Sequence, residues 1–337
     1  MTEPMRPSPS ELISAGNRAA GWVSNRLAAD GSFPGVENEI DAYYKMPVLF
    51  ALSDRPSQAQ AIEMHLRKRF FEDGDFHANT PAEVLSFRNY RNGWIARGLQ
   101  MLGSTQMATA AGDYLEGEMV QSFGAVVTEP WKPGVKVMDW GTTCSAAKAF
   151  LCLGRNQAAI CCGEYLLETL ANQPLAERFL LKRDLNGDYL RDDDPTFVIE
   201  IGGTDQIYFP LGFGMLVFAD LYALTGDGKW LNAAEKLYDT VMKCNDEIYS
   251  VITNRKAAWG AAQLYSVTGD AKYAQLSLHI WQWTMDTQTP EGLWLRHPEY
   301  SSLEEQPLEF TVDAAVESGL YMFELARSLS GYLVKDQ

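Results

Sequence analysis

Histidine and cysteine are scarce in this chain of 337 residues, which holds four histidines and five cysteines. The cysteines form no C-x-x-C pair and their number is odd, so the sequence predicts neither a disulfide framework nor a cysteine-based zinc site. An H-E-x-x-H motif and a glycine-rich phosphate loop are also missing. We therefore expect no metal ion and no cofactor.

Positive charge is in short supply as well, since 28 Lys and Arg residues against 44 Asp and Glu residues give a formal net charge of -16. This charge opposes binding to phosphate backbones, which argues against nucleic acids and anionic membranes as partners. No apolar run approaches the roughly 20 residues that cross a bilayer. Residues 1–16 are acidic and proline-containing where a signal peptide needs a basic start and an apolar stretch, so we expect a cytoplasmic protein.

Alternating valine and isoleucine, which indicate β-strands, are nearly absent, whereas apolar residues recur at helical spacing between loops rich in Gly, Asp, Asn and Pro. The predicted helices cover residues 10–29, 38–54, 56–72, 88–103, 105–121, 139–154, 156–172, 205–225, 227–243, 252–268, 270–286 and 310–330. Twelve helices make six hairpins. We expect one domain over residues 1–337, because toroids hold this many residues around a single core.

Two kinds of turn repeat along the chain. A glycine followed two residues later by an aromatic closes four helix-to-loop transitions, at residues 30–33, 73–76, 186–189 and 291–294. The opposite connections are short, as at residues 225–230 and 268–273. Every second helix, beginning with 38–54, is rich in apolar and small residues, which predicts an inner ring. The long loops then gather at one end, where we expect the functional site.

These patterns resemble two known groups. The T-G-D turns at 225–230 and 268–273, the Ala-rich helices after them and the Gly-aromatic turns resemble the six-hairpin glycosidase and sugar-epimerase superfamily. The segments DGSFPG (30–35) and EIDAYYKMPVLFALS (39–53) resemble the toroids of terpenoid cyclases and protein prenyltransferases. Both resemblances imply an all-α (α/α)6 toroid over nearly the whole chain. The DxDD motif of proton-initiated terpene cyclases and the Asp/Cys/His zinc site of prenyltransferases are absent, so neither activity is implied.

The ends of the inner helices are the first place to look for chemistry, because their N-termini face the mouth of a toroid. The acid or base candidates there are Asp41, Asp139, Asp205 and Glu317. Asp139, Asp205 and Asp313 also stand where helix N-caps belong, so capping remains an alternative for these three. His297, in the loop after Trp294, is a candidate proton shuttle near neutral pH, with a backbone-bonded loop histidine as the alternative.

Aromatic side chains are abundant at the same helix ends and are expected to line a substrate cavity. They are Tyr44, Tyr90, Trp94, Trp140, Tyr208, Trp259 and Trp294. These features favour a cofactor-independent isomerase or cyclase that encloses a small, partly apolar molecule and rearranges it by acid-base chemistry and confinement. One alternative is a glycoside hydrolase or sugar epimerase with paired carboxylates. Another is a helical scaffold that binds a protein on its acidic surface.

Overall fold

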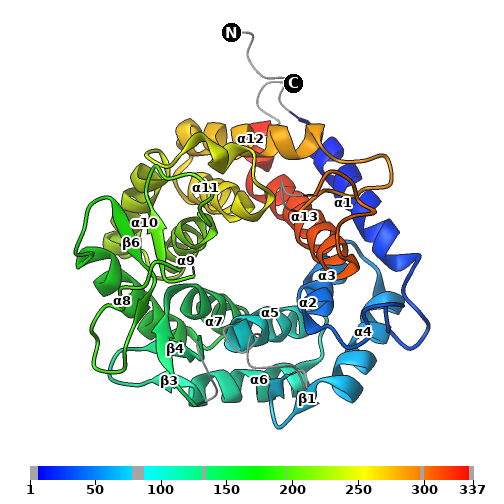
Figure 1. Cartoon of the computed structure of the whole chain (residues 1–337), viewed down its shortest axis with the longest axis horizontal. Helices are drawn as coiled ribbons and strands as arrows, with labels where there is room; N and C mark the ends of the chain where they lie inside the picture. The colour runs from blue at the N-terminus through cyan, green and yellow to red at the C-terminus, as the bar shows by residue number, and fades with distance from the viewer. Residues whose placement is uncertain (1–6, 78–86, 131–133, 195, 297–299, 334–337) are drawn as a thin grey trace. The chain divides into compact units, whose positions relative to one another are not determined.

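A computed structural model of the chain describes residues 7–77, 87–130, 134–194, 196–296 and 300–333. The chain divides into two compact units, one formed by Leu27–Glu200 and the other by Met1–Arg26 together with Ile201–Gln337. Each unit is built mainly from helical hairpins, as the sequence predicts (Figure 1). The expectation of one domain over the whole chain stays a prediction. In the described part of the chain, no helix is both long and apolar enough to cross a membrane.

The unit formed by Leu27–Glu200 contains three consecutive hairpins. Its helices are α2 (Ile40–Tyr43), α3 (Met46–Leu52), α4 (Pro56–Arg69), α5 (Arg88–Met101), α6 (Thr105–Gly117), α7 (Trp140–Cys152) and α8 (Asn156–Ala171). The helices α3, α5 and α7 pack side by side, and α4, α6 and α8 cover them from one side (Figure 1). The predicted helix 38–54 is interrupted between Tyr43 and Met46 because Pro47 lacks the N–H that would continue the helix.

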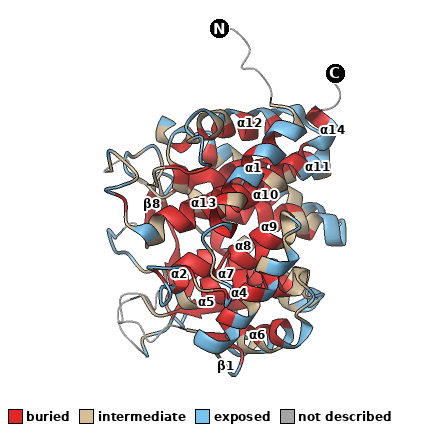
Figure 2. Cartoon of the chain, turned by 90° about the vertical axis from the view of Figure 1, so that its right-hand side faces the viewer, coloured by how far each residue is buried: buried red, intermediate tan, exposed pale blue. Residues whose placement is uncertain are grey.

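Burial explains why the helices alternate in composition. Nearly every residue of α7 is buried, whereas α8 is buried along one face only. The covering helix α6 likewise carries both buried and exposed residues (Figure 2). A helix enclosed on all sides must be apolar and small around its whole circumference, whereas a helix on the outside needs only one apolar stripe. The alternation seen in the sequence is therefore the alternation between enclosed and covering helices.

Short strands occupy the connections between these hairpins. They are β1 (Phe71–Glu72), β2 (Asp75–Phe76), β3 (Met119–Val120), β4 (Ala125–Thr128), β5 (Val137–Asp139), β6 (Arg178–Leu180), β7 (Lys182–Arg183) and β8 (Val198–Glu200). Antiparallel pairing gives a four-stranded sheet in the order β3-β4-β5-β7 and two-stranded sheets β1-β2 and β6-β8. In the four-stranded sheet Asp139 lies opposite Lys182, so a carboxylate that begins α7 faces a cation from a distant loop.

The second unit contains the remaining helices. They are α1 (Pro9–Ser24), α9 (Phe209–Thr225), α10 (Gly228–Val241), α11 (Arg255–Thr268), α12 (Ala271–Asp286), α13 (Leu308–Ser328) and α14 (Ser330–Leu333), with 3-10 turns at Asp246–Tyr249 and Ile252–Asn254. Helix α11 packs against α9, α12 and α13, and α1 packs on α13. A Cβ on Gly212 would lie 2.2 Å from the backbone nitrogen of Ala257, so glycine allows α9 and α11 to approach backbone to backbone.

The repeated turns do what their sequences predict. Gly226 and Gly269 adopt φ values of 71° and 74° and end α9 and α11. The next residues, Asp227 and Asp270, each accept a backbone hydrogen bond of 3.0 Å as N-caps of α10 and α12. In the Gly-aromatic turns, Gly31 has a φ of 82°, and a Cβ there would meet the carbonyl oxygen of Ala61 at 2.0 Å. These turns therefore require glycine for both conformation and space.

Candidate functional site

A hydrogen-bonded cluster joins the neighbouring helices α11 and α13. Lys256 Nζ donates to Glu317 Oε1 at 2.5 Å, and Tyr321 Oη donates to the same oxygen at 2.8 Å. Tyr321 follows Glu317 by one helical turn, which places both side chains on one face of α13. We call Lys256, Glu317 and Tyr321 the Glu317 cluster. It brings an ammonium, a carboxylate and a phenol, all able to exchange protons, within hydrogen-bonding distance.

The surroundings of the Glu317 cluster are apolar and largely closed to solvent. The side chain of Glu317 is 12% exposed and that of Lys256 only 4%. Lys256 Nζ lies 4.7 Å from the ring centroid of Phe209 and 5.9 Å from that of Phe213. Because water is mostly excluded, the attraction between Lys256 and Glu317 is stronger than it would be on the surface. A change in the charge of either side chain therefore has a large effect on the energy of the other.

Asp313 lies one turn before Glu317 on α13 and is also buried. Its carboxylate Oδ2 lies 3.6 Å from Arg296 Nη2. The alternative that Asp313 caps a helix is wrong, because α13 begins at Leu308 and Asp313 lies inside it. The sequence predicts a helix start at residue 310, two residues after the observed start at Leu308, which makes Asp313 look closer to the N-cap than it is. Two acidic side chains therefore follow each other along one face of α13, each with its own cation.

Asp41 forms a separate ion pair in the unit Leu27–Glu200. Arg91 Nε and Nη2 donate to the two carboxylate oxygens of Asp41 at 2.6 and 2.9 Å. The Arg91 side chain is 5% exposed, whereas that of Asp41 is 44% exposed. Nearby in sequence, Lys45 is buried with its Nζ 4.5 Å from the Tyr44 ring centroid. The two-point contact fixes the orientation of Asp41 while leaving part of its carboxylate open to a ligand.

Asp139 is the N-cap of α7. Its Oδ1 accepts from the backbone N–H of Thr142 at 2.6 Å, which satisfies one of the unpaired donors of the first helical turn. Its Oδ2 lies 3.3 Å from Nζ of the buried Lys182. The capping role considered for Asp139 is thus present, and it coexists with an ion pair that no local sequence pattern indicates.

Asp205 does not extend these clusters. Asp205 is exposed, has a φ of 56°, and donates its backbone N–H to Glu247 Oε2 at 2.7 Å. The capping alternative for Asp205 is wrong because α9 begins at Phe209, with Tyr208 at the N-cap position. Pro210 in the first turn fixes that start. His297 lies outside the described residues.

The predicted aromatic residues are all buried. Tyr44, Tyr90, Trp94 and Trp140 belong to the unit Leu27–Glu200, whereas Tyr208, Trp259 and Trp294 belong to the other unit. Some have packing partners of their own: the Trp140 ring meets Phe179 edge-on with centroids 4.9 Å apart, and Trp294 Nε1 donates to the Thr284 carbonyl at 2.8 Å. Their role as walls of a substrate cavity remains a prediction.

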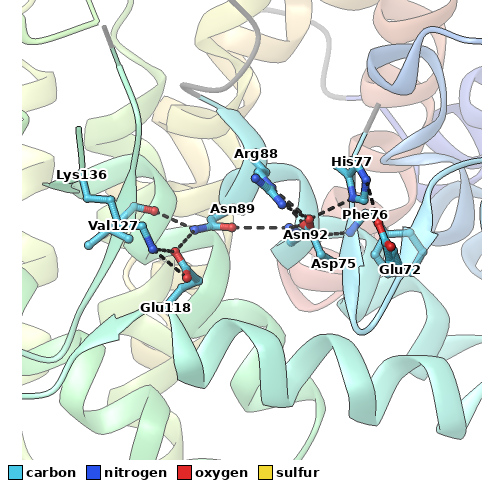
Figure 3. Close-up of polar contacts among 10 residues, drawn as sticks. All are labelled: Glu72, Asp75, Phe76, His77, Arg88, Asn89, Asn92, Glu118, Val127 and Lys136. Carbon is cyan, nitrogen blue, oxygen red and sulfur yellow. Dashed lines mark hydrogen bonds and ion pairs between the residues drawn. The ribbon is translucent and has the colours of Figure 1, made fainter. Parts of the chain in front are cut away.

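A further polar network surrounds the buried Asp75 of β2, at the N-terminal end of α5. Arg88 Nε and Asn92 Nδ2 donate to the Asp75 carboxylate at 3.0 and 2.8 Å, and His77 Nδ1 lies 3.0 Å from it (Figure 3). Asn92 Oδ1 also accepts from the backbone N–H of Phe76 at 2.7 Å. These contacts fasten the β1-β2 hairpin to α5, which gives the network a structural role.

The same figure shows a neighbouring group on the other side of the α5 terminus. Asn89 Nδ2 donates to the carbonyl oxygen of Val127 at 2.9 Å, and Lys136 Nζ donates to Glu118 Oε2 at 2.7 Å (Figure 3). Among the described residues, no group of three or more His, Cys, Asp or Glu side chains is arranged to hold a metal ion.

Comparisons with solved structures define the fold. The chain is similar to a D-mannose isomerase with a TM-score of 0.71 and 11% identity, covering 93% of this chain and 97% of that chain. It is also similar to a GH76 α-mannanase from Bacteroides thetaiotaomicron, with a TM-score of 0.66, 15% identity, and coverage of 96% and 97%. The fold is an (α/α)6 toroid. The fold class and the resemblance to the six-hairpin glycosidase toroids are therefore confirmed.

Two further comparisons concern proteins that act on carbohydrates. An α-1,6-mannanase variant from Salegentibacter, in complex with α-1,6-mannotetrose, matches with a TM-score of 0.64, 13% identity, and coverage of 94% and 99%. Residues 205–289 match the family model of the β-L-arabinofuranosidase GH127 catalytic domain. No curated protein matches the chain by sequence. The resemblance to the terpenoid cyclase toroids stays a prediction.

Sequence reasoning missed the cations of the toroid's candidate sites. Lys256 is the second residue of α11, a helix rich in small apolar residues, and a lysine in such a place is a detectable signal, since burial of an ammonium requires a partner. Its partner Glu317 is 61 positions away, and Arg91 is 50 positions from Asp41. Only the Glu317 and Tyr321 pair, spaced by one helical turn, could have been found from local spacing.

Proposed function

We propose that this protein is an enzyme acting on a carbohydrate, and that it isomerises or epimerises a sugar with the Glu317 cluster. The observation that carries the proposal is the convergence of Lys256 and Tyr321 on one oxygen of Glu317, at 2.5 and 2.8 Å. The similarity to a D-mannose isomerase over 93% of the chain supports the reaction class. The proposal keeps the isomerase expected from the sequence. It replaces the expected substrate, a small and partly apolar molecule, with a sugar.

Sugar isomerisation needs only proton movements, so the cluster contains the required groups. The Glu317 carboxylate would take the proton from the carbon beside the sugar carbonyl, and the bonding electrons would form a carbon–carbon double bond. The carbonyl oxygen would receive a proton from Tyr321 or Lys256. Return of a proton to the former carbonyl carbon, with loss of the proton from the neighbouring hydroxyl oxygen, gives the isomer. Return of a proton to the opposite face of the same carbon, with loss of the proton from the first oxygen, gives the epimer, and neither route involves net oxidation.

The apolar surroundings suit this chemistry. Phe209 and Phe213 flank Lys256 and keep water from competing for its protons. The developing negative charge on the sugar oxygen would be stabilised by an ammonium whose position is already fixed by Glu317. Donors placed in advance in a medium of low polarity contribute more to rate than the same donors in water.

Deuterium incorporation tests the proposal directly. Aldoses and ketoses, D-mannose among them, would be incubated with the protein in D2O and followed by proton NMR. We expect a sugar product that carries deuterium at the reacting carbon, because a proton held on Glu317 exchanges with solvent. Glu317→Gln and Tyr321→Phe should each lower the rate by about 100-fold or more, the usual range for losing a positioned acid or base.

Tyr273→Phe is the matched control. Tyr273 Oη donates to Glu235 Oε1 at 2.8 Å, the same contact as in the Glu317 cluster but between the covering helices α10 and α12. Its loss should leave the rate unchanged. Conversion that is insensitive to Glu317→Gln, or a product without deuterium at any position, would contradict the proposed role of the cluster.

Glycoside hydrolysis is a second candidate, favoured by the α-mannanase matches and by the GH127 catalytic-domain match over residues 205–289. Most glycoside hydrolases use two carboxyl groups beside the glycosidic bond. Asp41 and Asp139 are the carboxylates of the unit Leu27–Glu200 to test. Release of reducing sugar from α-1,6-mannan, or of phenol from an aryl β-L-arabinofuranoside, would support hydrolysis if Asp41→Asn or Asp139→Asn abolishes it. The cyclase and protein-scaffold alternatives stay predictions.

A further inference from the structure

Arg255, the first residue of α11, is a buried cation whose hydrogen bonds are not used. The residue is 1% exposed, and neither Nε nor Nη1 nor Nη2 has a hydrogen-bond partner in the described part of the chain. A guanidinium carries five N–H donors and no acceptor. Burial without partners is costly for any polar group and most costly for a charge. The arrangement therefore points to a missing acceptor.

Two tryptophans flank the guanidinium. Arg255 Cζ lies 5.0 Å from the Trp294 ring centroid and 5.6 Å from that of Trp281. Each ring contributes a cation–π attraction, which offsets part of the desolvation cost. Contact with an aromatic face leaves the N–H groups in the guanidinium plane unused. Those N–H groups form the planar fork that binds a carboxylate or phosphate at two points.

Other unused donors lie next to Arg255 in the chain or on the helix that packs against α11. Asn254 Nδ2 and Trp281 Nε1 are buried and have no hydrogen-bond partner among the described residues, and the same holds for the Thr284 hydroxyl. Trp281 and Thr284 are three residues apart on α12, which packs directly against α11. An excess of donors without acceptors is the composition expected of an anion site.

The nearest carboxylate does not supply the missing partner. Glu317 influences Arg255 electrostatically, but its Oε1 is already bound by Lys256 and Tyr321, and no hydrogen bond joins Glu317 to the guanidinium. Burial lowers the pKa of Arg255 to about 9, and the negative charge of Glu317 offsets only part of this effect. An additional anion would offset the remainder.

We propose that Arg255 binds an anionic group of the ligand, a carboxylate or a phosphate, so that the substrate is an acidic sugar. The assignment of the anion to a sugar rests on the proposed function. Anion binding itself does not, since it follows from the unused donors. The electrostatic proximity of Arg255 to Glu317 would place the anionic group and the reacting carbon on one small molecule.

Binding measurements test this without turnover. D-glucuronate, glucose 6-phosphate, inorganic phosphate and D-glucose would be titrated into the full chain by calorimetry at constant ionic strength. Glucose matches glucuronate except for the carboxylate. We expect at least one anionic compound to bind more tightly than glucose by about 10- to 100-fold, the usual contribution of hydrogen bonds to a charged group. Preference for glucuronate would indicate a carboxylate, and preference for the phosphates would indicate a phosphoryl group.

Arg255→Met and Arg26→Met separate the site from other effects. Arg26 also lies over a tryptophan, with Cζ 4.3 Å from the Trp22 ring centroid, but it is exposed. Arg255→Met should abolish the preference for anions and leave the Tm of the ligand-free protein equal or higher, because it removes an uncompensated buried charge. Arg26→Met should retain the preference.

Two results would overturn the inference. One is equal affinity of the wild-type chain for all four compounds, which does not depend on any variant folding. The other is a lower Tm for Arg255→Met together with unchanged anion affinity, which would make Arg255 a structural cation held by its tryptophans. A Glu317→Gln variant that still binds glucuronate would keep the anion site even if the proposed sugar chemistry failed.

Discussion

The two roles of Asp139 can be separated by stability measurements. Asp139 caps α7 through Thr142 and pairs with Lys182 across the sheet. Asp139→Asn keeps an oxygen for the cap and removes the charge, whereas Asp139→Ala removes both. Adding Lys182→Met to Asp139→Ala removes the cation that the first substitution leaves behind. This set of variants divides the energy between cap and ion pair.

The structure sets the expected magnitudes. Loss of an N-cap costs about 1 kcal/mol. Loss of one partner of a buried ion pair costs about 3–5 kcal/mol, because the other charge stays buried. Lys182 keeps two other contacts, the carbonyl oxygen of Thr196 and the ring of Phe197 at 4.6 Å, so the lower end of that range applies. We expect Asp139→Ala to lose about 4 kcal/mol, Asp139→Asn about 3, and the double variant only about 1–2.

Urea unfolding followed by circular dichroism and tryptophan fluorescence measures these differences, provided that the two transitions coincide. The decisive feature is the order of stability: the double variant should be more stable than Asp139→Ala. If the losses from Asp139→Ala and Lys182→Met simply add, the two residues do not interact energetically, and the ion pair has no part in holding the start of α7.

Three further substitutions test other parts of the fold. Gly212→Ala should destabilise the protein by about 3 kcal/mol or more, because the added Cβ would lie 2.2 Å from the backbone nitrogen of Ala257. Thermal unfolding measures this loss, and an unchanged Tm would contradict the close contact between α9 and α11. Asp75→Asn should cost about 2 kcal/mol in urea unfolding through its bonds to Arg88, and a loss below the measurement error would refute the fastening role of the network. Burial raises the pKa of Tyr43 to about 12 from 10, so its contribution to stability is fully present below pH 10 and is lost as the pH rises through 12; Tyr43→Phe should flatten that slope.

The helices could be predicted because their signals are local. Apolar spacing, the Thr-Gly-Asp turns and the Gly-aromatic turns each act within a few residues, and all twelve predicted helices are present in the structure. Where an observed helix boundary differs from the predicted one, the cause is also local. Pro47 divides one predicted helix, and Pro210 sets the start of α9 four residues after the predicted position. Residues 252–254 form a separate 3-10 turn before α11.

The candidate sites could be predicted only in part, because their partners are distant in sequence. Asp41 and Glu317 were identified by their positions within helices, and both lie in ion pairs. The cations that complete these pairs lie 50 and 61 positions away, so no local spacing connects them to their carboxylates. Capping was the correct interpretation for Asp139 and the wrong one for Asp205 and Asp313, since a shift of a few residues in the helix start changes which carboxylate can cap.

The pairing of carboxylates with cations bears on the choice between isomerase and hydrolase. Glu317, Asp41 and Asp139 each contact a lysine or arginine that is itself buried. In the Glu317 cluster the carboxylate shares one oxygen with two proton donors, Lys256 and Tyr321, so a base and an acid lie within one hydrogen-bonded group. Isomerisation begins with a carboxylate that accepts a proton from carbon, whereas hydrolysis begins with a carboxyl group that donates a proton to the leaving oxygen. This pairing of a base with a proton donor favours the isomerase, and it requires a bell-shaped dependence of the rate on pH, the profile of one essential base and one essential acid; a rate that rises with pH and never falls again would contradict it.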